Sequence, residues 1–254
     1  MARTVLITGA TSGIGRATAN AFAKNGDNLI ILGRRKNLLS EAKAELENSY
    51  KIQVATYVLD VTQRKQSELV IATILEEQPM IDILVNNAGL ALDLEKFQNY
   101  SLADVDQMID TNIKGLLYVS RLILPHMVAH NQGHIINIGS TAGIAAYAGA
   151  AVYCATKAAV KVLSDGMRID TIDTNIKITT IQPGIVETDF STVRFHGDKE
   201  RAAQVYKGVE ALKSQDIADV ILYVANQPQH VQISDVTIMA TQQATGSMIF
   251  RTND

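Results

Sequence analysis

The chain has 254 residues, of which 47% are hydrophobic and 19% are charged. This composition readily buries a core and argues against extended disorder. A formal charge of −3 gives no sign of a basic surface for nucleic acid or for an anionic membrane. The single cysteine, Cys154, excludes an intramolecular disulfide, and no apolar run reaches the roughly 18 residues that span a bilayer. With an apolar segment beginning close to the N-terminus, we expect a soluble, cytoplasmic protein without a signal peptide.

Short β-branched runs alternate with longer amphipathic stretches, a rhythm typical of βαβ units around a mostly parallel sheet. The predicted strands are residues 4–8, 28–32, 53–58, 83–86, 134–138, 177–181 and 236–240. The predicted helices are residues 14–25, 36–48, 63–77, 102–130, 152–174 and 214–226. Because several strands are apolar almost throughout, we expect a doubly wound α/β fold with helices on both faces of a sheet of about seven strands.

The rhythm crosses the midpoint of the chain without a linker, which favours a single catalytic domain over residues 1–254. Residues 190–206 are the exception, because they are polar and lack a clear period. Such a segment is more typical of a loop or lid on the substrate side of a site than of a sheet element.

The first predicted strand runs into a glycine-rich turn, Thr8-Gly9-Ala10-Thr11-Ser12-Gly13-Ile14-Gly15. Glycines allow a tight turn and a close approach of the backbone, and the helix that follows presents unpaired N–H groups to a phosphate. The spacing is G-x-x-x-G-x-G rather than the commonest dinucleotide fingerprint, so a strand-to-helix turn that merely needs glycines is the alternative. The motif predicts a pyrophosphate site.

Two arginines, Arg34 and Arg35, follow the second predicted strand, and no carboxylate accompanies them. An acidic side chain here usually accepts the ribose 2′-hydroxyl of NAD, whereas a guanidinium suits the 2′-phosphate of NADP. The pair therefore predicts NADP, and a solvated pair of charges is the alternative. Asp60 and Val61, after the third strand, are suited to contact an adenine ring, although an aspartate there is commonly a helix cap.

Tyr153 and Lys157 lie four residues apart in a predicted helix, so their side chains share one face. A phenol with a pKa of roughly 10 is a poor base near neutral pH, but a neighbouring ammonium favours the phenolate. Ser140 follows the strand at residues 134–138, where its hydroxyl could hold a substrate oxygen beside that helix. Taken singly, these residues are more often surface packing or a cap.

Taken together, the motifs resemble the short-chain dehydrogenase/reductase family along essentially the whole chain. The landmarks occur in the family's order: the glycine-rich turn, Asp60-Val61, Asn86-Asn87-Ala88-Gly89, Asn112, Ser140, Tyr153, Lys157 and Pro183-Gly184. The resemblance implies a Rossmann fold and hydride transfer by a nicotinamide cofactor, for which the protein supplies orientation and a proton. It also implies a homodimer or a homotetramer.

By this resemblance, Tyr153 is the general acid or base, Ser140 polarises the carbonyl, and Lys157 lowers the tyrosine pKa and binds the nicotinamide ribose. Asn112 supports a water in a proton relay. Besides Tyr153, Lys157, Gly9, Thr11, Ser12, Gly13, Ile14, Gly15, Arg34, Arg35, Asp60 and Val61, the implied cofactor contacts are Asn87, Ala88, Gly89, Pro183, Gly184, Ile185 and Thr188.

Within the family, the chain is most similar to NADP-dependent 3-hydroxy acid dehydrogenases, some of which act on serine. The stretches that carry this similarity are residues 87–92, 138–143 with 147–149, 190–195 and 229–233. We expect Ser140, Tyr147, Tyr153 and Arg194 to contact the substrate, with the Arg194 guanidinium gripping a carboxylate at two points. The alternative for Arg194 is a salt bridge to a nearby acid or to a neighbouring subunit.

Two other functions remain open at this point. One is reduction of neutral ketones or aldehydes by NADPH, and the other is an interaction protein that senses NADP without catalysis. The complete set of Asn112, Ser140, Tyr153 and Lys157 argues against a pure sensor, which has no chemical need for a phenol beside an ammonium. We expect a small-molecule substrate and, given the net charge of −3, no nucleic-acid or membrane partner. We also expect no metal, because the histidines lack a nearby zinc signature.

Overall fold

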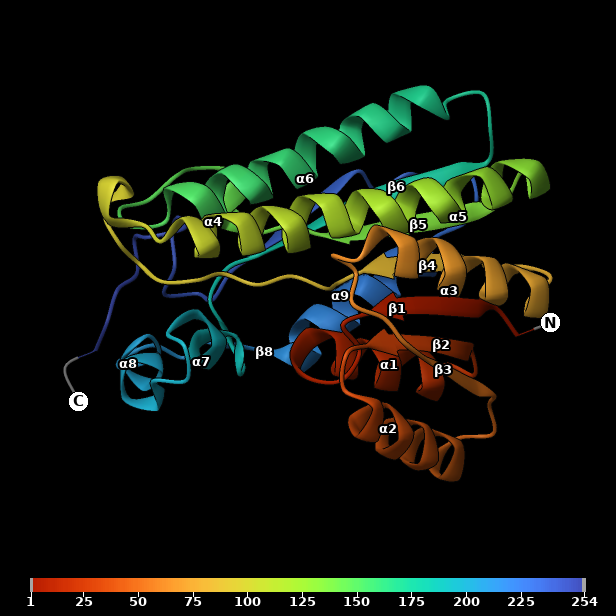
Figure 1. The fold of residues 1–254 in the computed structure, drawn as a ribbon, viewed down its shortest axis with the longest axis horizontal. Helices are drawn as coiled ribbons and strands as arrows, with labels where there is room; N and C mark the ends of the chain where they lie inside the picture. Colours follow the sequence, from red (N-terminus) through yellow and green to blue (C-terminus); the bar gives the residue numbers. More distant parts are fainter. Residues whose placement is uncertain (1, 253–254) are drawn as a thin grey trace.

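The computed structural model describes residues 2–252, and its strands form one parallel seven-stranded sheet in the order β3-β2-β1-β4-β5-β6-β9 (Figure 1). The central neighbours are β1 (Thr4–Thr8) and β4 (Ile83–Asn86), and the strand order reverses between them. Sheets of this kind bind ligands beyond the carboxyl ends of the strands at that reversal. The predicted doubly wound α/β fold is confirmed.

The other strands of the sheet are β2 (Asn28–Gly33), β3 (Val54–Val58), β5 (Gly133–Ile138), β6 (Ile176–Pro183) and β9 (Asp235–Ile238). A separate parallel pair consists of β7 (Val186–Glu187) and β8 (Leu212–Lys213). The helices are α1 (Gly13–Lys24), α2 (Lys36–Ser49), α3 (Arg64–Glu77), α4 (Leu102–Ile109), α5 (Leu116–His130), α6 (Ala151–Asp170), α7 (Phe190–Arg194), α8 (Lys199–Gln204) and α9 (Ser214–Ala225).

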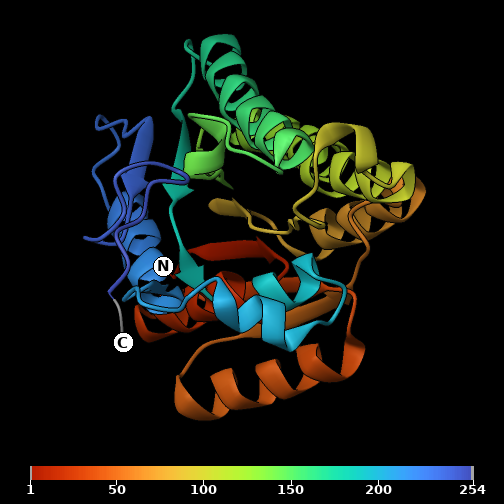
Figure 2. The ribbon, with the colours of Figure 1, turned by 90° about the vertical axis from the view of Figure 1, so that its left-hand side faces the viewer.

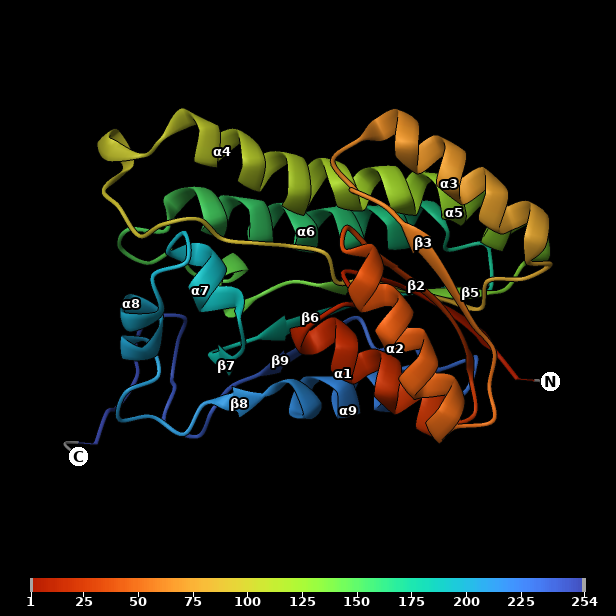
Figure 3. The ribbon, with the colours of Figure 1, turned by 60° about the horizontal axis from the view of Figure 1, so that its bottom comes forward.

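The core lies in two layers, one on each face of the sheet. Val5 and Ile7 of β1 pack into the layer that α1, α2 and α9 cover, whereas Leu6 packs into the layer beneath α3 and α5. Figures 1 and 3 show these helix groups on opposite sides of the sheet. Because both faces are covered, the strands have to be apolar at consecutive positions, as the sequence indicates.

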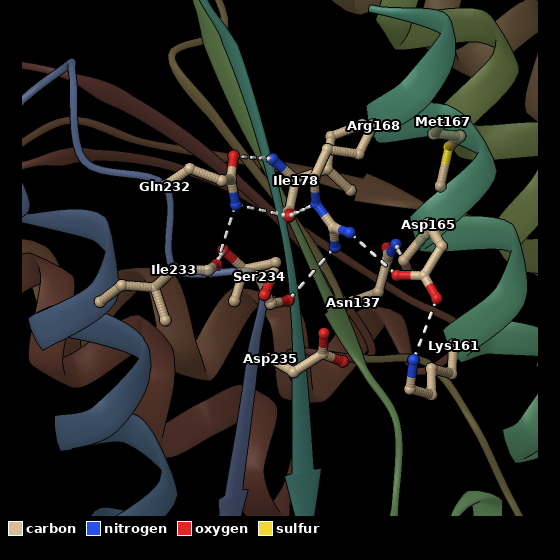
Figure 4. A network of polar contacts seen from close by, with 12 residues as sticks. Asn137, Lys161, Asp165, Met167, Arg168, Ile178, Gln232, Ile233, Ser234 and Asp235 are labelled. Atoms are coloured by element: carbon tan, nitrogen blue, oxygen red, sulfur yellow. Dashed lines mark hydrogen bonds and ion pairs between the residues drawn. The ribbon is translucent and has the colours of Figure 1, made fainter. Parts of the chain in front are cut away.

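A polar network fastens the C-terminal part of α6 to the sheet (Figure 4). Arg168 donates to the carbonyl oxygens of Ile178 and Ser234 at 3.1 and 3.3 Å, and to Asp165 at 2.9 Å. The Gln232 side-chain amide accepts from the Ile178 N–H at 3.1 Å and donates to the Ile178 carbonyl at 2.8 Å. It thus pairs with the backbone of β6 as a neighbouring strand would. These contacts fix the helix whose opposite end carries Tyr153 and Lys157.

Two predicted elements differ from the structure. The predicted helix over residues 102–130 is interrupted by a π-helical segment, Asp110–Gly115, between α4 and α5. Residues 190–206, expected as a loop, contain the short helices α7 and α8, with Asp198 capping α8 through the Arg201 N–H at 3.0 Å. Figures 1 and 2 place both helices at the carboxyl end of the sheet. Helices of five and six residues are too short to give a clear period.

Within residues 2–252, no helix is both long and apolar enough to cross a membrane. The same residues bring together no group of three or more His, Cys, Asp or Glu side chains that could hold a metal ion.

Candidate active site

A cleft of about 370 Å³ opens at the carboxyl ends of the central strands, within the size range of small-molecule sites. The predicted site residues that line it are Gly9, Thr11, Ser12, Gly13, Ile14, Arg34, Arg35, Asp60, Val61, Asn87, Ala88, Gly89, Ser140, Tyr153, Lys157, Pro183, Gly184 and Thr188. Five others lie outside this lining, namely Gly15, Asn112, Tyr147, Ile185 and Arg194.

Sequence reasoning missed several lining residues, which are Leu32, Gly33, Leu59, Leu90, Thr111, Ile138, Gly139, Val186, Asp189, Phe190 and Val193. Most of them flank a residue that was identified. Gly33, for example, ends β2 just before Arg34, and Gly139 lies between the end of β5 and Ser140. Their signal is their position at the carboxyl end of a strand rather than their chemistry.

The glycine-rich turn has the backbone conformation that the motif predicts. Gly9 and Gly13 have φ values of 65° and 54°, a left-handed conformation that side chains disfavour. Gly15 lies behind the turn, where a Cβ would overlap Gly9 O and the Asn87 amide. That amide donates to the carbonyls of Thr8 and Gly9, both at 3.1 Å, and so connects the end of β4 to the turn. The turn leads into α1, whose first N–H groups are suited to bind an anion.

The two arginines after β2 lie in different settings. Arg35 donates to the Thr11 and Ser12 hydroxyls at 2.7 and 3.1 Å, so its guanidinium lies across the glycine-rich turn. Arg34 is exposed and lines the cleft without a hydrogen bond or ion pair to any of residues 2–252. Asp60 accepts from the Thr62 N–H and hydroxyl at 3.0 and 2.8 Å. At this end of the cleft, Arg34 is therefore an unpaired cation within residues 2–252, whereas the Asp60 carboxylate already accepts two hydrogen bonds from Thr62.

Ser140, Tyr153 and Lys157 come together at the other end of the cleft. Ser140 follows β5, and its oxygen accepts from the Ala142 N–H at 3.1 Å. Lys157 Nζ donates to Ile138 O at 2.8 Å and lies 6.0 Å from the centre of the Tyr153 ring. Tyr153 and Lys157 are only 7% and 6% exposed, so little water shields these groups.

Burial controls the titration of this pair. It raises the pKa of Tyr153 to about 12, against the opposing effect of the Arg194 charge, and contact with the Ser140 hydroxyl also lowers that pKa. Burial likewise lowers the pKa of Lys157 to about 8. Loss of solvent therefore moves the pKa of this phenol away from neutral pH, whereas the lysine was expected to move it toward neutral pH. A phenol in this state is suited to donate a proton.

Asn112 acts as a clamp rather than as part of the cleft wall. Its amide oxygen accepts from Leu90 N at 2.9 Å, and its amide nitrogen donates to Leu90 O at 2.7 Å and to Thr156 Oγ1 at 3.0 Å. Thr156 in turn donates to the carbonyl of Tyr153 at 2.8 Å. The clamp joins the π-helical segment, the loop after β4 and the turn of α6 that carries the phenol.

Arg194 lies against the phenol but not on the lining of the cleft. Its guanidinium carbon is 5.4 Å from the centre of the Tyr153 ring and 5.3 Å from that of Phe190. One nitrogen donates to the Tyr147 hydroxyl at 3.5 Å, while the buried Nε has no hydrogen-bond acceptor in the described part of the chain. No carboxylate within residues 2–252 forms a salt bridge with it, so the intramolecular ion pair considered from the sequence is absent there.

The segment that carries Arg194 is attached to the opposite side of the cleft. The Arg194 carbonyl accepts from the Asp93 N–H at 2.8 Å, and the Asp93 carboxylate pairs with Arg201 of α8 at 3.3 Å. His196, between α7 and α8, contacts Asp104 of α4 at 3.2 Å. Phe190 and Val193 of α7 contribute apolar side chains to the lining. These contacts span the cleft from α7 and α8 to the loop after β4.

Comparisons with known proteins agree with this geometry. A family model described as short chain dehydrogenase matches residues 3–199. A curated NADP-dependent 3-hydroxy acid dehydrogenase of Schizosaccharomyces pombe is 42% identical over 98% of this chain and 96% of its own length, and one of Salmonella typhi is 46% identical over 97% and 99%. A solved structure described as the closed form of serine dehydrogenase complexed with NADP⁺ has a TM-score of 0.92 and 42% identity, covering 98% of this chain and all of its own.

Proposed function

The chain belongs to the short-chain dehydrogenase family, and we propose that it transfers a hydride between NADP(H) and a short 3-hydroxy acid or its 3-oxo acid, such as serine and its oxidised form. The observation that carries the proposal is one cleft with a phosphate-type glycine turn and two arginines at one end and a serine beside a buried tyrosine and lysine at the other. Relatives over almost the whole chain share this activity by name.

The cleft fits NADP on the chemistry of its donors. The glycine-rich turn and the start of α1 would hold the pyrophosphate, and Arg34, which has no side-chain partner among the described residues 2–252, would meet the 2′-phosphate with Arg35 beside it. Asp60 and Val61 would flank the adenine, while Lys157 would bind the nicotinamide ribose. Pro183, Gly184 and Thr188 line the cleft and would meet the nicotinamide. When bound, the cofactor supplies the hydride acceptor or donor.

The remaining chemistry belongs to side chains of this protein. Ser140 would hold the substrate oxygen, and Tyr153 would exchange a proton with that oxygen. A raised pKa keeps the phenol protonated near neutral pH, which favours proton donation during carbonyl reduction. In the oxidative direction the same hydroxyl would have to lose its proton, with the charges of Lys157 and Arg194 supporting the phenolate. We infer that Asn112 acts through its clamp on Leu90 and Thr156.

We also infer that Arg194 recognises the substrate carboxylate. The buried Nε of its guanidinium finds no acceptor among residues 2–252, and a small acid bound against Tyr153 would provide one. The carboxylate would then set the 3-hydroxyl toward the phenol. The segment of α7 and α8 would serve as the substrate-side lid, because it carries Arg194 and meets the loop after β4.

We further propose a cytoplasmic location and assembly into a homodimer or homotetramer. Several apolar side chains of α5 and α6 are exposed, among them Leu117 at 37%, Val162 at 68% and Ile169 at 69%. Exposed apolar groups on neighbouring helices favour packing against a second copy. Light scattering of the purified protein should give two or four times the mass of the chain, and a monomer would contradict the proposal.

The test of function is NADPH formation from NADP⁺ with serine, 3-hydroxybutyrate and 3-hydroxypropionate, compared with secondary alcohols of similar size that lack the carboxylate. NAD⁺ is run in parallel. We expect turnover of the acids with NADP⁺. Turnover of the neutral alcohols alone would instead indicate a carbonyl reductase, and cofactor binding without turnover would indicate a sensor.

A further inference from the structure

The chain leaves β6 through a turn of residues Pro183, Gly184 and Ile185, and Pro183 and Gly184 line the same cleft as the glycine-rich turn. One strand of the main sheet and one strand of the separate β7–β8 pair hold this turn. Gly184 N donates to Ile238 O of β9 at 2.8 Å, and Ile185 O accepts from Leu212 N of β8 at 3.0 Å. The N–H of Ile185 bonds to neither strand and needs another acceptor.

That acceptor is the side chain of Gln243, in the C-terminal tail, which we define as residues 240–252. Gln243 Oε1 accepts from Ile185 N at 2.8 Å, and its Nε2 donates to Thr245 O at 2.9 Å. The side chain is buried, with 6% of the residue exposed. Both ends of a buried amide are therefore satisfied, one by the tail and one by the cleft wall.

The absence of a side chain at Gly184 makes this contact possible. A Cβ there would overlap Gln243 Oε1 and lie 2.9 Å from its Cδ. The backbone of Gly184 has no left-handed φ, so turn geometry alone does not demand glycine at this position. The glycine is explained by the close approach of the Gln243 amide.

The wall that Gln243 supports lies next to the reacting groups. The Ser140 hydroxyl donates to Pro183 O at 3.4 Å, and both Pro183 and Gly184 line the cleft. Moving this turn would shift the surface on which the nicotinamide half would rest relative to Ser140. The adenine half would rest at the other end of the cleft, against Arg34 and Asp60, which Gln243 does not touch.

We propose that Gln243 is a positioning residue that holds the turn of residues 183–185 against Ser140 and thereby sets affinity for the nicotinamide half of NADP. The assignment rests on the proposed function. It gives the C-terminal tail a specific role in shaping the cofactor site through one buried amide. No part of Gln243 has to touch the cofactor or the substrate.

The neighbouring Gln242 provides a matched control. Its side chain accepts from Glu210 N at 2.8 Å and donates to Gly208 O and Phe250 O, each at 3.3 Å. Gln242 therefore attaches the same tail to a different segment, beside α8 in Figure 1. If the tail acted only by staying in place, loss of either glutamine would have the same effect.

The test is calorimetric titration of wild type, Gln243→Met and Gln242→Met with NADP⁺ and, separately, with 2′,5′-ADP, which carries only the adenine half. We expect Gln243→Met to weaken NADP⁺ binding about tenfold, the scale of one buried hydrogen bond, and to change 2′,5′-ADP binding less than twofold. Gln242→Met should leave both within twofold. In turnover, Gln243→Met should raise KM for NADP⁺ more than KM for the hydroxy acid.

Equal losses for both ligands, no loss for either, or equal losses in the two glutamine variants would overturn the assignment. Failure of wild type to bind 2′,5′-ADP would instead overturn the proposed cofactor, and the assignment with it. If Gln243→Met does not fold, as judged by circular dichroism, Gly184→Ala displaces the same amide from the other side. It should weaken NADP⁺ binding and leave 2′,5′-ADP binding within twofold, and equal losses for the two ligands would contradict the contact.

Discussion

Replacing Arg194 by methionine separates recognition of the substrate carboxylate from support of the phenol. Methionine keeps a flexible apolar chain over the Tyr153 and Phe190 rings and removes the guanidinium, including the Nε that has no acceptor. The change should therefore affect binding of an acid without opening a large hole beside α7. Both effects can be measured with one pair of substrates.

The size of the effect follows from two charge-assisted hydrogen bonds in a buried site. Each contributes roughly 1.5–3 kcal/mol, and part is spent on removing water from the two ions, so a net loss of about 3 kcal/mol is expected. Since 1.36 kcal/mol is a factor of ten, kcat/KM for 3-hydroxybutyrate should fall roughly a hundredfold. The Arg194 charge also lowers the pKa of Tyr153, so a smaller loss should be common to all substrates.

The assay compares 3-hydroxybutyrate with butan-2-ol, in which a methyl group takes the place of the carboxylate. The decisive quantity is the acid-to-alcohol ratio of kcat/KM, because the common loss cancels in it. Arg201→Met is the control, since Arg201 stacks on Phe195 at 4.3 Å in the same segment without touching Tyr153. A ratio in Arg194→Met that matches wild type would refute carboxylate recognition by Arg194.

Three further changes test the rest of the site. Tyr153→Phe should reduce kcat at least about a hundredfold, while its affinity for NADP⁺, measured by calorimetry, should stay within threefold of wild type. In wild type, the rate of oxidation should rise with pH, because the buried phenol must ionise. Lys157→Met should flatten the pH dependence of urea unfolding. Burial lowers the Lys157 pKa from 10.5 to about 8, so over part of the pH range the folded chain releases a proton that the unfolded chain retains. The free energy of unfolding of wild type should therefore rise by about 2 kcal/mol relative to that of the variant between roughly pH 7 and 9.5. Arg34→Ser should raise KM for NADP⁺ about tenfold and leave KM for NAD⁺ unchanged, because only NADP carries the 2′-phosphate.

Contradictory results are equally specific. A Tyr153→Phe variant that keeps its activity, a Lys157→Met variant with the pH dependence of wild type, or equal effects of Arg34→Ser on the two cofactors would each remove one assignment.

The parts of the molecule that follow from local patterns could be predicted from the sequence. All seven strands of the main sheet and the positive φ of Gly9 and Gly13 were accessible, because apolar runs and glycine spacing are local properties of the chain. Tyr153 and Lys157 share a helix face for the same reason.

Contacts between distant segments could not be predicted in this way. Asn112 clamps Leu90, Arg194 stacks on Tyr153 instead of lining the cleft, and Gln243 reaches Ile185 from the far end of the chain. Each contact depends on tertiary packing that no local period encodes. The same holds for the phenol, whose pKa is decided by burial rather than by the lysine four residues away.

The most direct test of the central claim is the fate of the hydrogen on C3 of a 3-hydroxy acid. The protein is incubated with NADP⁺ and 3-hydroxypropionate carrying two deuterium atoms at C3, and the reduced cofactor is analysed by NMR and mass spectrometry. Direct hydride transfer predicts one deuterium at C4 of the nicotinamide in each NADPH formed. NADPH without deuterium, or no NADPH with this acid, serine or 3-hydroxybutyrate, would contradict the account.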